Sequence, residues 1–202
     1  MVWASDLMDL VPDDSTPLDP EEAHGLRLSF ITTRADLNEA EALNLEQGLL
    51  WARSRAGRTD ILSERFLREL HQQMFGNVWR WAGKYRRTDK NIGISWWEVP
   101  SAVKLLLDDA RVWRSMIGSS WSVDELCGHF HHRLVSIHPF PNGNGRHSRA
   151  MSDLLAVSLG AHRYSWGRTN LAEDGDVRRR YIAALRRADN NDIRPLIEFM
   201  RS

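Results

Sequence analysis

His138-Pro139-Phe140-Pro141-Asn142-Gly143-Asn144-Gly145-Arg146-His147-Ser148-Arg149 is the stretch of this 202-residue chain that says most about its architecture and its chemistry. Its two prolines stop the helix that precedes them. Gly143 and Gly145 permit positive φ angles and a close approach to the backbone. A helix that begins directly after these glycines has unpaired N–H groups and the positive end of its dipole. The stretch therefore predicts an anion-binding site at a helix N-terminus.

Three side chains around this turn extend the prediction. Arg146 and Arg149 lie on one side of the first helical turn, and two guanidinium groups beside free N–H groups suit a polyphosphate. His138 is at the opposite rim, where an imidazole could take a proton from an attacking hydroxyl. An Asn-Gly turn or a His-Pro corner alone can be only a helix stop. The combination at fixed offsets favours a phosphate site with a base beside it.

Helical periodicity dominates the chain from residue 36 onward. We expect helices at about 36–55, 63–76, 100–116, 122–137, 145–160, 174–188 and 192–200. In the first of them, apolar residues recur at helical spacing and predict one apolar face, made of Leu37, Leu43, Leu50 and Trp51. Ser122 and Glu125 form a capping-box pattern before the fourth. The sum is an all-α domain at residues 31–202, preceded by an irregular, proline-interrupted N-terminal arm at residues 1–30.

The segment at residues 77–99 has a different pattern, because it is rich in aromatic residues and interrupted by Gly83. After it, Ile92, Ile94 and Trp96 alternate with other residues, which is typical of a β-strand. We therefore expect one short β-hairpin beside the helices.

The composition limits the class of protein. The chain is 42% hydrophobic and 27% charged with a formal net charge of zero, so no overall positive field would attract nucleic acid. The single cysteine, Cys127, excludes an intramolecular disulfide and suits a reducing compartment. Residues 1–12 lack the basic region of a signal peptide, and no apolar run approaches the ~20 residues of a membrane span. We expect a cytoplasmic protein without direct nucleic-acid or membrane binding.

A zinc site is an alternative use of the histidines that precede His138. His129 and His132 are one helical turn apart and lie near Cys127, but a complete ligand set is missing. Buried and surface histidines on an ordinary helix are the simpler interpretation.

The stretch from His138 to Arg149 closely resembles the Fic motif H-P-F-x-[D/E]-G-N-G-R-x-x-R, and every fixed position except Asn142 matches. The segment Trp81–Arg86 and the tail from Tyr181 to Phe199 also resemble Fic proteins, so the similarity covers roughly residues 36–200. The resemblance implies the Fic fold, a helical bundle with a small β-hairpin flap beside the active-site loop. More narrowly, the chain resembles the subgroup called mobile mystery protein B, found on mobile elements beside a helix-turn-helix partner protein.

The resemblance also implies a role for each motif position. His138 would deprotonate a Ser, Thr or Tyr hydroxyl of a target protein, and Phe140 would anchor the loop in the core. Asn144 would contact the α-phosphate of ATP, while Arg146 and Arg149 would hold the β- and γ-phosphates. Backbone donors would come from Gly143 and Gly145. Pyrophosphate would leave, and AMP would stay on the target.

Two further roles follow from the same resemblance. The acidic motif position, here Asn142, would hold Mg²⁺ against the phosphates. An amide lacks the charge of a carboxylate, so we expect the metal to be weakly held by the protein. The flap would align the target by strand addition, through residues Ile92, Gly93, Ile94, Ser95 and Trp96.

Many Fic proteins are silenced by a helix with the pattern [S/T]-x-x-x-E-[G/N], whose glutamate pairs with the second motif arginine, here Arg149. Residues Thr169 to Glu173 have the spacing but are followed by Asp174, so the copy is imperfect. A chain without a built-in lock would suit a toxin-like element that is controlled by a partner.

The resemblance leaves three functions open. The first is a nucleotidyltransferase that moves AMP, or another nucleoside monophosphate, from a nucleotide to a protein hydroxyl. The second is a phosphoryl transferase of the kind seen in the Doc branch, or an enzyme that removes AMP. The third is a catalytically weak nucleotide-binding module, which the departure at Asn142 would explain.

Overall fold

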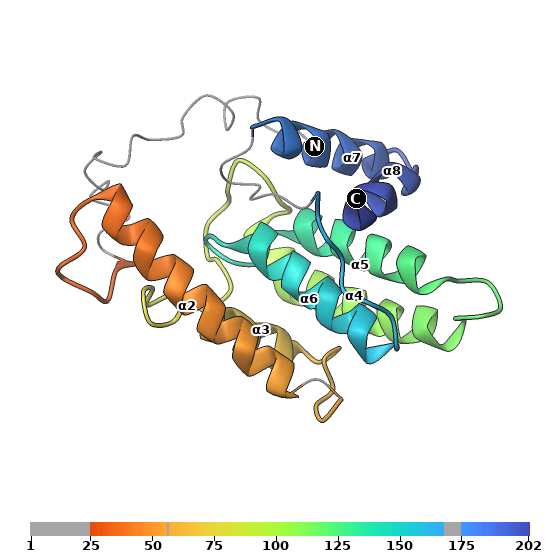
Figure 1. Cartoon of the computed structure of the whole chain (residues 1–202), viewed down its shortest axis with the longest axis horizontal. Coiled ribbons are helices and arrows are strands. Elements are labelled where there is room, and N and C mark those ends of the chain that lie inside the picture. Colours follow the sequence, from red (N-terminus) through yellow and green to blue (C-terminus); the bar gives the residue numbers. More distant parts are fainter. Residues whose placement is uncertain (1–24, 56, 168–174) are drawn as a thin grey trace.

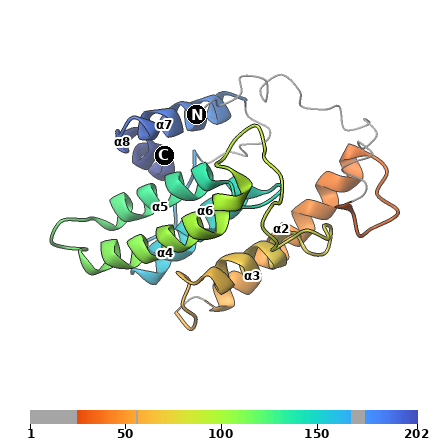
Figure 2. The same cartoon turned by 180° about the vertical axis from the view of Figure 1, so that it is seen from behind.

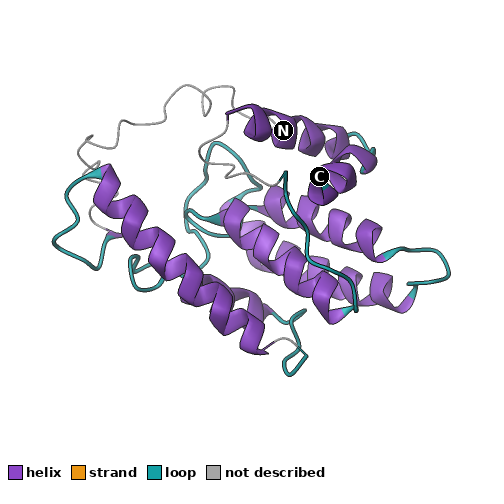
Figure 3. Cartoon of the chain, in the orientation of Figure 1, coloured by secondary structure: helices purple, strands orange, loops and turns teal. Residues whose placement is uncertain are grey.

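The computed structural model describes residues 25–55, 57–167 and 175–202. Within these ranges the chain consists of helices joined by turns, without a sheet (Figure 3). The helices are α2 (Arg34–Arg55), α3 (Glu64–Phe75), the 3₁₀ turn η2 (Trp96–Glu98), α4 (Val99–Ser115), α5 (Val123–Ile137), α6 (Asn144–Ser158), α7 (Gly175–Asp189) and α8 (Arg194–Arg201). The predicted all-α fold is confirmed.

The helices pack in pairs around one apolar core. Helix α2 lies along α3, α5 packs against both α4 and α6, and α7 pairs with α8, which also contacts α5 (Figures 1 and 2). Large side chains that are completely or almost completely buried fill the space between them, including Phe66, Phe75, Phe130, Leu134 and Phe140. This packing holds the connection between α5 and α6 against the end of α3, so the motif stretch rests on a rigid base.

Two of the predicted helix starts, at Ser63 and Ser122, match the observed caps. Ser63 caps α3 and accepts a hydrogen bond from the N–H of Phe66 at 3.2 Å. At the start of α5, the Ser122 hydroxyl accepts from the N–H of Glu125 at 3.1 Å, and the Glu125 carboxylate accepts from the N–H of Ser122 at 2.8 Å. Both halves of the capping box are present, so α5 begins at a defined residue and brings His138 to a defined place.

The predicted apolar face of α2 is only partly correct. Leu37 is buried, but Leu43 and Leu50 are 58% and 55% exposed. The buried side instead carries Asn44, which bonds across to the carbonyl of Gln73 and the N–H of Asn77, and Gly48. A Cβ at Gly48 would lie 2.6 Å from the Met74 backbone. The two helices approach so closely at this point that Asn44 and Gly48, rather than the predicted Leu43 and Leu50, mark the contact.

The predicted β-hairpin does not form. Residues 91–94 form bends, and the 3₁₀ turn η2 begins at Trp96. Gly93 has a φ of 105°, which breaks an extended run, and the carbonyl of Ile94 and the N–H of Trp96 bond to side chains instead of to a second strand. The segment at residues 88–97, called the flap segment below, is therefore an irregular loop.

Two predictions fall on residues outside the described ranges. They are the greater part of the N-terminal arm, residues 1–24, and the Thr169–Glu173 segment. Where the description begins, Leu26 pairs with Trp79 in an isolated antiparallel bridge. Among the described helices, none has the length and apolar character that crossing a membrane requires.

Candidate active site

The motif stretch forms a tight corner between α5 and α6. His138 ends α5 in the left-handed conformation, with a φ of 53°, and its N–H bonds to the carbonyl of Leu134. Gly143 precedes α6 with a φ of 76°, and a Cβ there would lie 2.6 Å from the Phe75 ring. Gly143 is thus needed both for its dihedral angle and for its contact with the core.

The corner is anchored from within by Phe140 and Asn144. Phe140 is completely buried and stacks on His71 with 3.7 Å between ring centroids. The amide of Asn144 accepts from the Phe140 N–H at 2.9 Å and donates to the Phe140 carbonyl at 2.8 Å. The expected anchoring by Phe140 is seen, and Asn144 also fixes the shape of the loop. Its contact with an α-phosphate stays a prediction.

His71 is a structural residue of the site that the sequence reasoning missed. Its Nδ1 accepts a hydrogen bond from the Gly83 N–H at 3.0 Å, so Nε2 carries the proton and donates to the Asn142 carbonyl at 3.1 Å. Burial holds the pKa of His71 well below its usual value, which keeps this neutral form. The sequence feature that could have identified His71 is its position on the apolar face of α3, four residues after Leu67.

The N-terminus of α6 presents free donors. No hydrogen bond is formed within the described chain by the backbone N–H groups of Asn144, Gly145 or Arg146, and the first bonded N–H is that of His147, to the Gly143 carbonyl at 2.9 Å. A Cβ added at Gly145 would meet no atom within 4 Å, so the space above it is open. The Gly143 N–H is already used by the Asn142 side chain at 2.6 Å. The predicted anion site therefore has open donors on its helical side.

The two motif arginines have different surroundings. Arg146 forms an ion pair with Glu41 of α2 at 2.6 Å, and the other carboxylate oxygen of Glu41 accepts from the Trp79 indole at 2.6 Å. The Arg149 side chain forms no hydrogen bond and no direct ion pair with any residue in the described ranges, although the charge of Asp153 acts on it from a longer distance. Burial lowers the pKa of its guanidinium, but an arginine remains charged at neutral pH. A largely buried cation that forms no direct ion pair is the expected complement of a phosphate.

His138 lies under the flap segment. A Cβ at Gly93 would be 2.7 Å from the Cβ of His138, so the glycine touches the histidine directly. Burial lowers the pKa of His138 to about 4, and the charges of Arg86 and Lys90 act in the same direction. The Nδ1 atom of His138 is buried without a hydrogen-bond partner. The imidazole is thus neutral at physiological pH.

The predicted metal position does not form a site made by the protein alone. Asn142 is exposed, and its one side-chain oxygen already accepts the Gly143 N–H. No group of three acidic, histidine or cysteine residues that could hold a metal occurs in the described part of the chain. The residues present do not fit a protein-held Mg²⁺ ion, and a metal at this place would depend on ligands brought by a nucleotide.

The histidines weighed as zinc ligands have other partners. His129 packs on Trp113 and Trp121, with ring centroids 6.1 Å and 5.1 Å away. His132 bonds to Asp189 at 2.8 Å. Burial raises the pKa of the Cys127 thiol to about 12, so it does not supply a thiolate. These contacts support the simpler interpretation of these residues as packing and surface groups.

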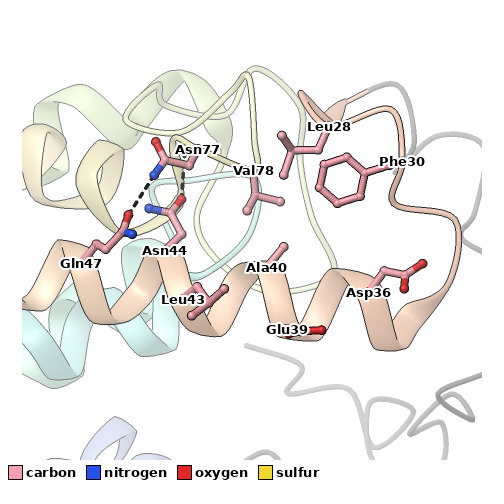
Figure 4. A pocket seen from close by; sticks show the side chains of 10 residues that line it. All are labelled: Leu28, Phe30, Asp36, Glu39, Ala40, Leu43, Asn44, Gln47, Asn77 and Val78. Carbon is pink, nitrogen blue, oxygen red and sulfur yellow. Dashed lines mark hydrogen bonds between the residues drawn. The ribbon is translucent and has the colours of Figure 1, made fainter.

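A separate groove of about 340 Å³ lies between the outer side of α2 and the start of the described chain (Figure 4). Leu28, Phe30, Leu43 and Asn77 are among its lining residues, and none of the lining residues belongs to the motif stretch. Its lining contains apolar and amide side chains and the carboxylates of Asp36 and Glu39, but no cation, so it is not the phosphate site.

Comparison with known proteins shows which protein family the chain is similar to. Residues 61–156 match the model of the Fic/DOC family. The chain is 30% identical over 134 residues to a protein of Drosophila persimilis named protein adenylyltransferase Fic. This match covers 65% of this chain and 25% of that protein. The chain thus spans about a quarter of the length of such curated relatives.

Solved structures resemble the whole described bundle. One of them is the N-terminal Fic domain of a cell filamentation protein from Bartonella quintana, with bound ADP. It is 18% identical to this chain with a TM-score of 0.67, and the match covers 86% of each chain. BepC from Bartonella tribocorum, with bound AMPPNP, is 17% identical with a TM-score of 0.67, and the match covers 93% of this chain and 91% of that one. At these identities the likeness shows the fold, which is the Fic fold. Together with the family match over residues 61–156, the chain is similar to the Fic/DOC family in sequence as well as in fold.

Proposed function

We propose that this protein transfers AMP from ATP to a Ser, Thr or Tyr hydroxyl of a target protein. The observation that carries the proposal is the pair of unsatisfied groups at the start of α6. These groups are the free N–H donors of the first residues of α6 and the Arg149 guanidinium, which forms no direct ion pair in the described chain. Together they suit the phosphates of a nucleotide.

The geometry gives each residue a role in the proposed reaction. The α6 N-terminus and Arg149 hold the phosphates, and the free nitrogens of Arg146 supplement them, because only its Nη1 is bonded to Glu41. His138 accepts the proton of the target hydroxyl, whose oxygen then attacks the α-phosphorus. The bond from the α-phosphorus to the bridging oxygen breaks, and pyrophosphate leaves. Burial makes His138 a weak base in the free protein, and bound phosphate charge raises its pKa toward a useful value.

The relatives support the transferase class. They are named protein adenylyltransferase Fic, and two structures of the same fold hold ADP and AMPPNP. We also propose that residues 31–202 form the domain that carries this activity. We propose further that the protein is a member of the mobile mystery protein B subgroup. It would then act as a toxin-like element that is controlled by a helix-turn-helix partner protein. Mg²⁺ would enter with the nucleotide.

The test is incubation of the purified protein with a cell lysate and ATP labelled at either the α- or the γ-phosphate, followed by mass analysis of modified proteins. We expect the α label to appear as AMP on hydroxyl side chains. His138→Ala should lower this transfer by about 10²–10⁴-fold while nucleotide affinity and thermal stability stay close to those of the parent. Transfer of the γ label would instead show a phosphoryl transferase. Nucleotide binding without any transfer would show a binding module.

A further inference from the structure

Arg86 is a buried cation that the proposed reaction does not use, and it binds the corner that carries His138. The residue is 2% exposed. Its Nε donates to the His138 carbonyl at 2.7 Å, its Nη2 donates to the Ile137 carbonyl at 3.3 Å, and its own N–H donates to the Pro139 carbonyl at 3.0 Å. Three successive carbonyls at the end of α5 therefore converge on one residue.

The same guanidinium also binds the flap segment. Its Nη1 donates to the Thr88 carbonyl at 3.1 Å, and its Nη2 donates to the Ile94 carbonyl. Asp89 lies 3.6 Å from Nη1 and accepts the Trp96 N–H at 2.8 Å. Arg86 and Asp89 thus join both ends of the flap segment to the His138 corner through hydrogen bonds that involve charged groups, which are stronger than neutral ones.

These bonds determine which part of the flap segment is open to a partner. The carbonyl of Ile94 and the N–H of Trp96 are used, and the Ser95 carbonyl accepts the Glu98 N–H at 3.0 Å. Within the described chain, the backbone groups of Ile92 and Gly93 form no hydrogen bonds. Gly93 is the residue that touches His138. The free edge of the flap segment therefore lies directly over the proposed base.

We infer that Arg86, together with Asp89, is a positioning residue that holds the second half of the flap segment and presents the Ile92–Gly93 edge to the backbone of the target over His138. The inference rests on the proposed function, since it names the residues that align the acceptor of that reaction. A target strand that pairs with this edge gains main-chain hydrogen bonds, and its hydroxyl is brought to the imidazole.

Lysine cannot replace Arg86 in this role. The guanidinium donates to four carbonyls in fixed directions: those of Thr88, Ile94, Ile137 and His138. An ammonium group has three donors at one point and cannot reach both the corner and the flap segment. The conservative change therefore keeps the charge and removes the connection.

The experiment compares Arg86→Lys and Asp89→Ala with a matched control, Arg87→Ala, at the exposed neighbouring arginine. Asp89 is 59% exposed, so its removal should leave the fold intact even if the Arg86 variant does not fold. Hydrogen exchange of peptides covering residues 88–97 and 124–136 reports whether Arg86 and Asp89 anchor the flap segment to the His138 corner, and it does not require activity. We expect exchange in the flap segment to become about tenfold faster or more in both variants and to stay unchanged in α5.

Activity is read as two rates from ATP labelled at the α-phosphate: transfer of AMP to lysate proteins, and transfer of AMP to water with release of pyrophosphate. Loss of the anchor should lower transfer to proteins by about tenfold or more, while transfer to water and ATP affinity stay within about twofold. Parental exchange in the flap segment, an unchanged ratio of the two rates, or an equal effect of Arg87→Ala would overturn the inference. If the parent shows neither reaction, the proposed function fails, whereas the exchange data still test the anchor.

Discussion

A methyl group added at Gly93 should separate the flap segment from His138. In the structure a Cβ at this position would lie 2.7 Å from the His138 Cβ and 3.2 Å from the Ile137 carbonyl, whereas ordinary contacts begin at 3.4 Å. Because Ile137 and His138 end a buried helix, the flap segment must move instead. A displacement approaching 1 Å at a reacting group typically costs on the order of 10²-fold in rate. We expect Gly93→Ala to lower transfer to proteins by about 10- to 100-fold.

Backbone strain has to be separated from this displacement, because Gly93 has a φ of +105° and an alanine there is strained in any case. Gly118 provides the control, since its φ is +84° and a Cβ there would meet no atom within 4 Å. Both alanine variants should lose about 1–2 kcal/mol of unfolding free energy. Only Gly93→Ala should lose transfer, with ATP affinity retained. A Gly93→Ala protein with the parental transfer rate would refute the proposed contact between flap and base.

Three other changes test separate parts of the site. Arg149→Ala should weaken ATP binding more than AMP binding, because the lost cation faces the distal phosphates. Calorimetric titration with both ligands measures this, and equal losses of affinity would contradict the assignment. Asn142→Asp should raise transfer at low Mg²⁺, because a carboxylate is the better magnesium ligand; weaker ATP binding across a whole Mg²⁺ series would oppose it. Burial lowers the pKa of His131 to about 3 and that of His147 to about 4, so between these values and 6.5 the unfolded chain binds more protons than the folded one. Stability should therefore fall as the pH drops below 6.5, by roughly 2 kcal/mol for each histidine at pH 5, and urea unfolding at several pH values measures it; a flat profile would count against the buried neutral histidines.

Local signals predicted the helices and the motif corner well. Ser63, Ser122 and Glu125 specify helix starts through bonds to residues three positions away, which are visible in the sequence. The glycine turn before α6 is equally local. A prediction from such signals needs no knowledge of what packs on the element, and for that reason it was accurate here.

Contacts over long distances account for what was missed. The burial of Asn44 and the exposure of Leu43 depend on how closely α2 approaches α3 at Gly48, which hydropathy does not show. The alternating isoleucines of the flap segment indicated a strand, but Arg86 and Asp89 take its hydrogen bonds. Propensity for a strand is overridden when side chains from other elements satisfy the backbone.

The ion pair between Arg146 and Glu41 has a consequence for how the site is assembled. It joins residues 105 positions apart in the chain. The glycine turn can form from neighbouring residues, but the ion pair of Arg146 forms only after α2 has docked, and closing such a long loop is a slow step of folding. A fragment that begins at residue 61, where the family match starts, keeps the whole motif but lacks Glu41. In such a fragment Arg146 would lose its ion pair and keep only its contact with the Phe75 ring, so truncation would weaken phosphate binding without removing a single motif residue.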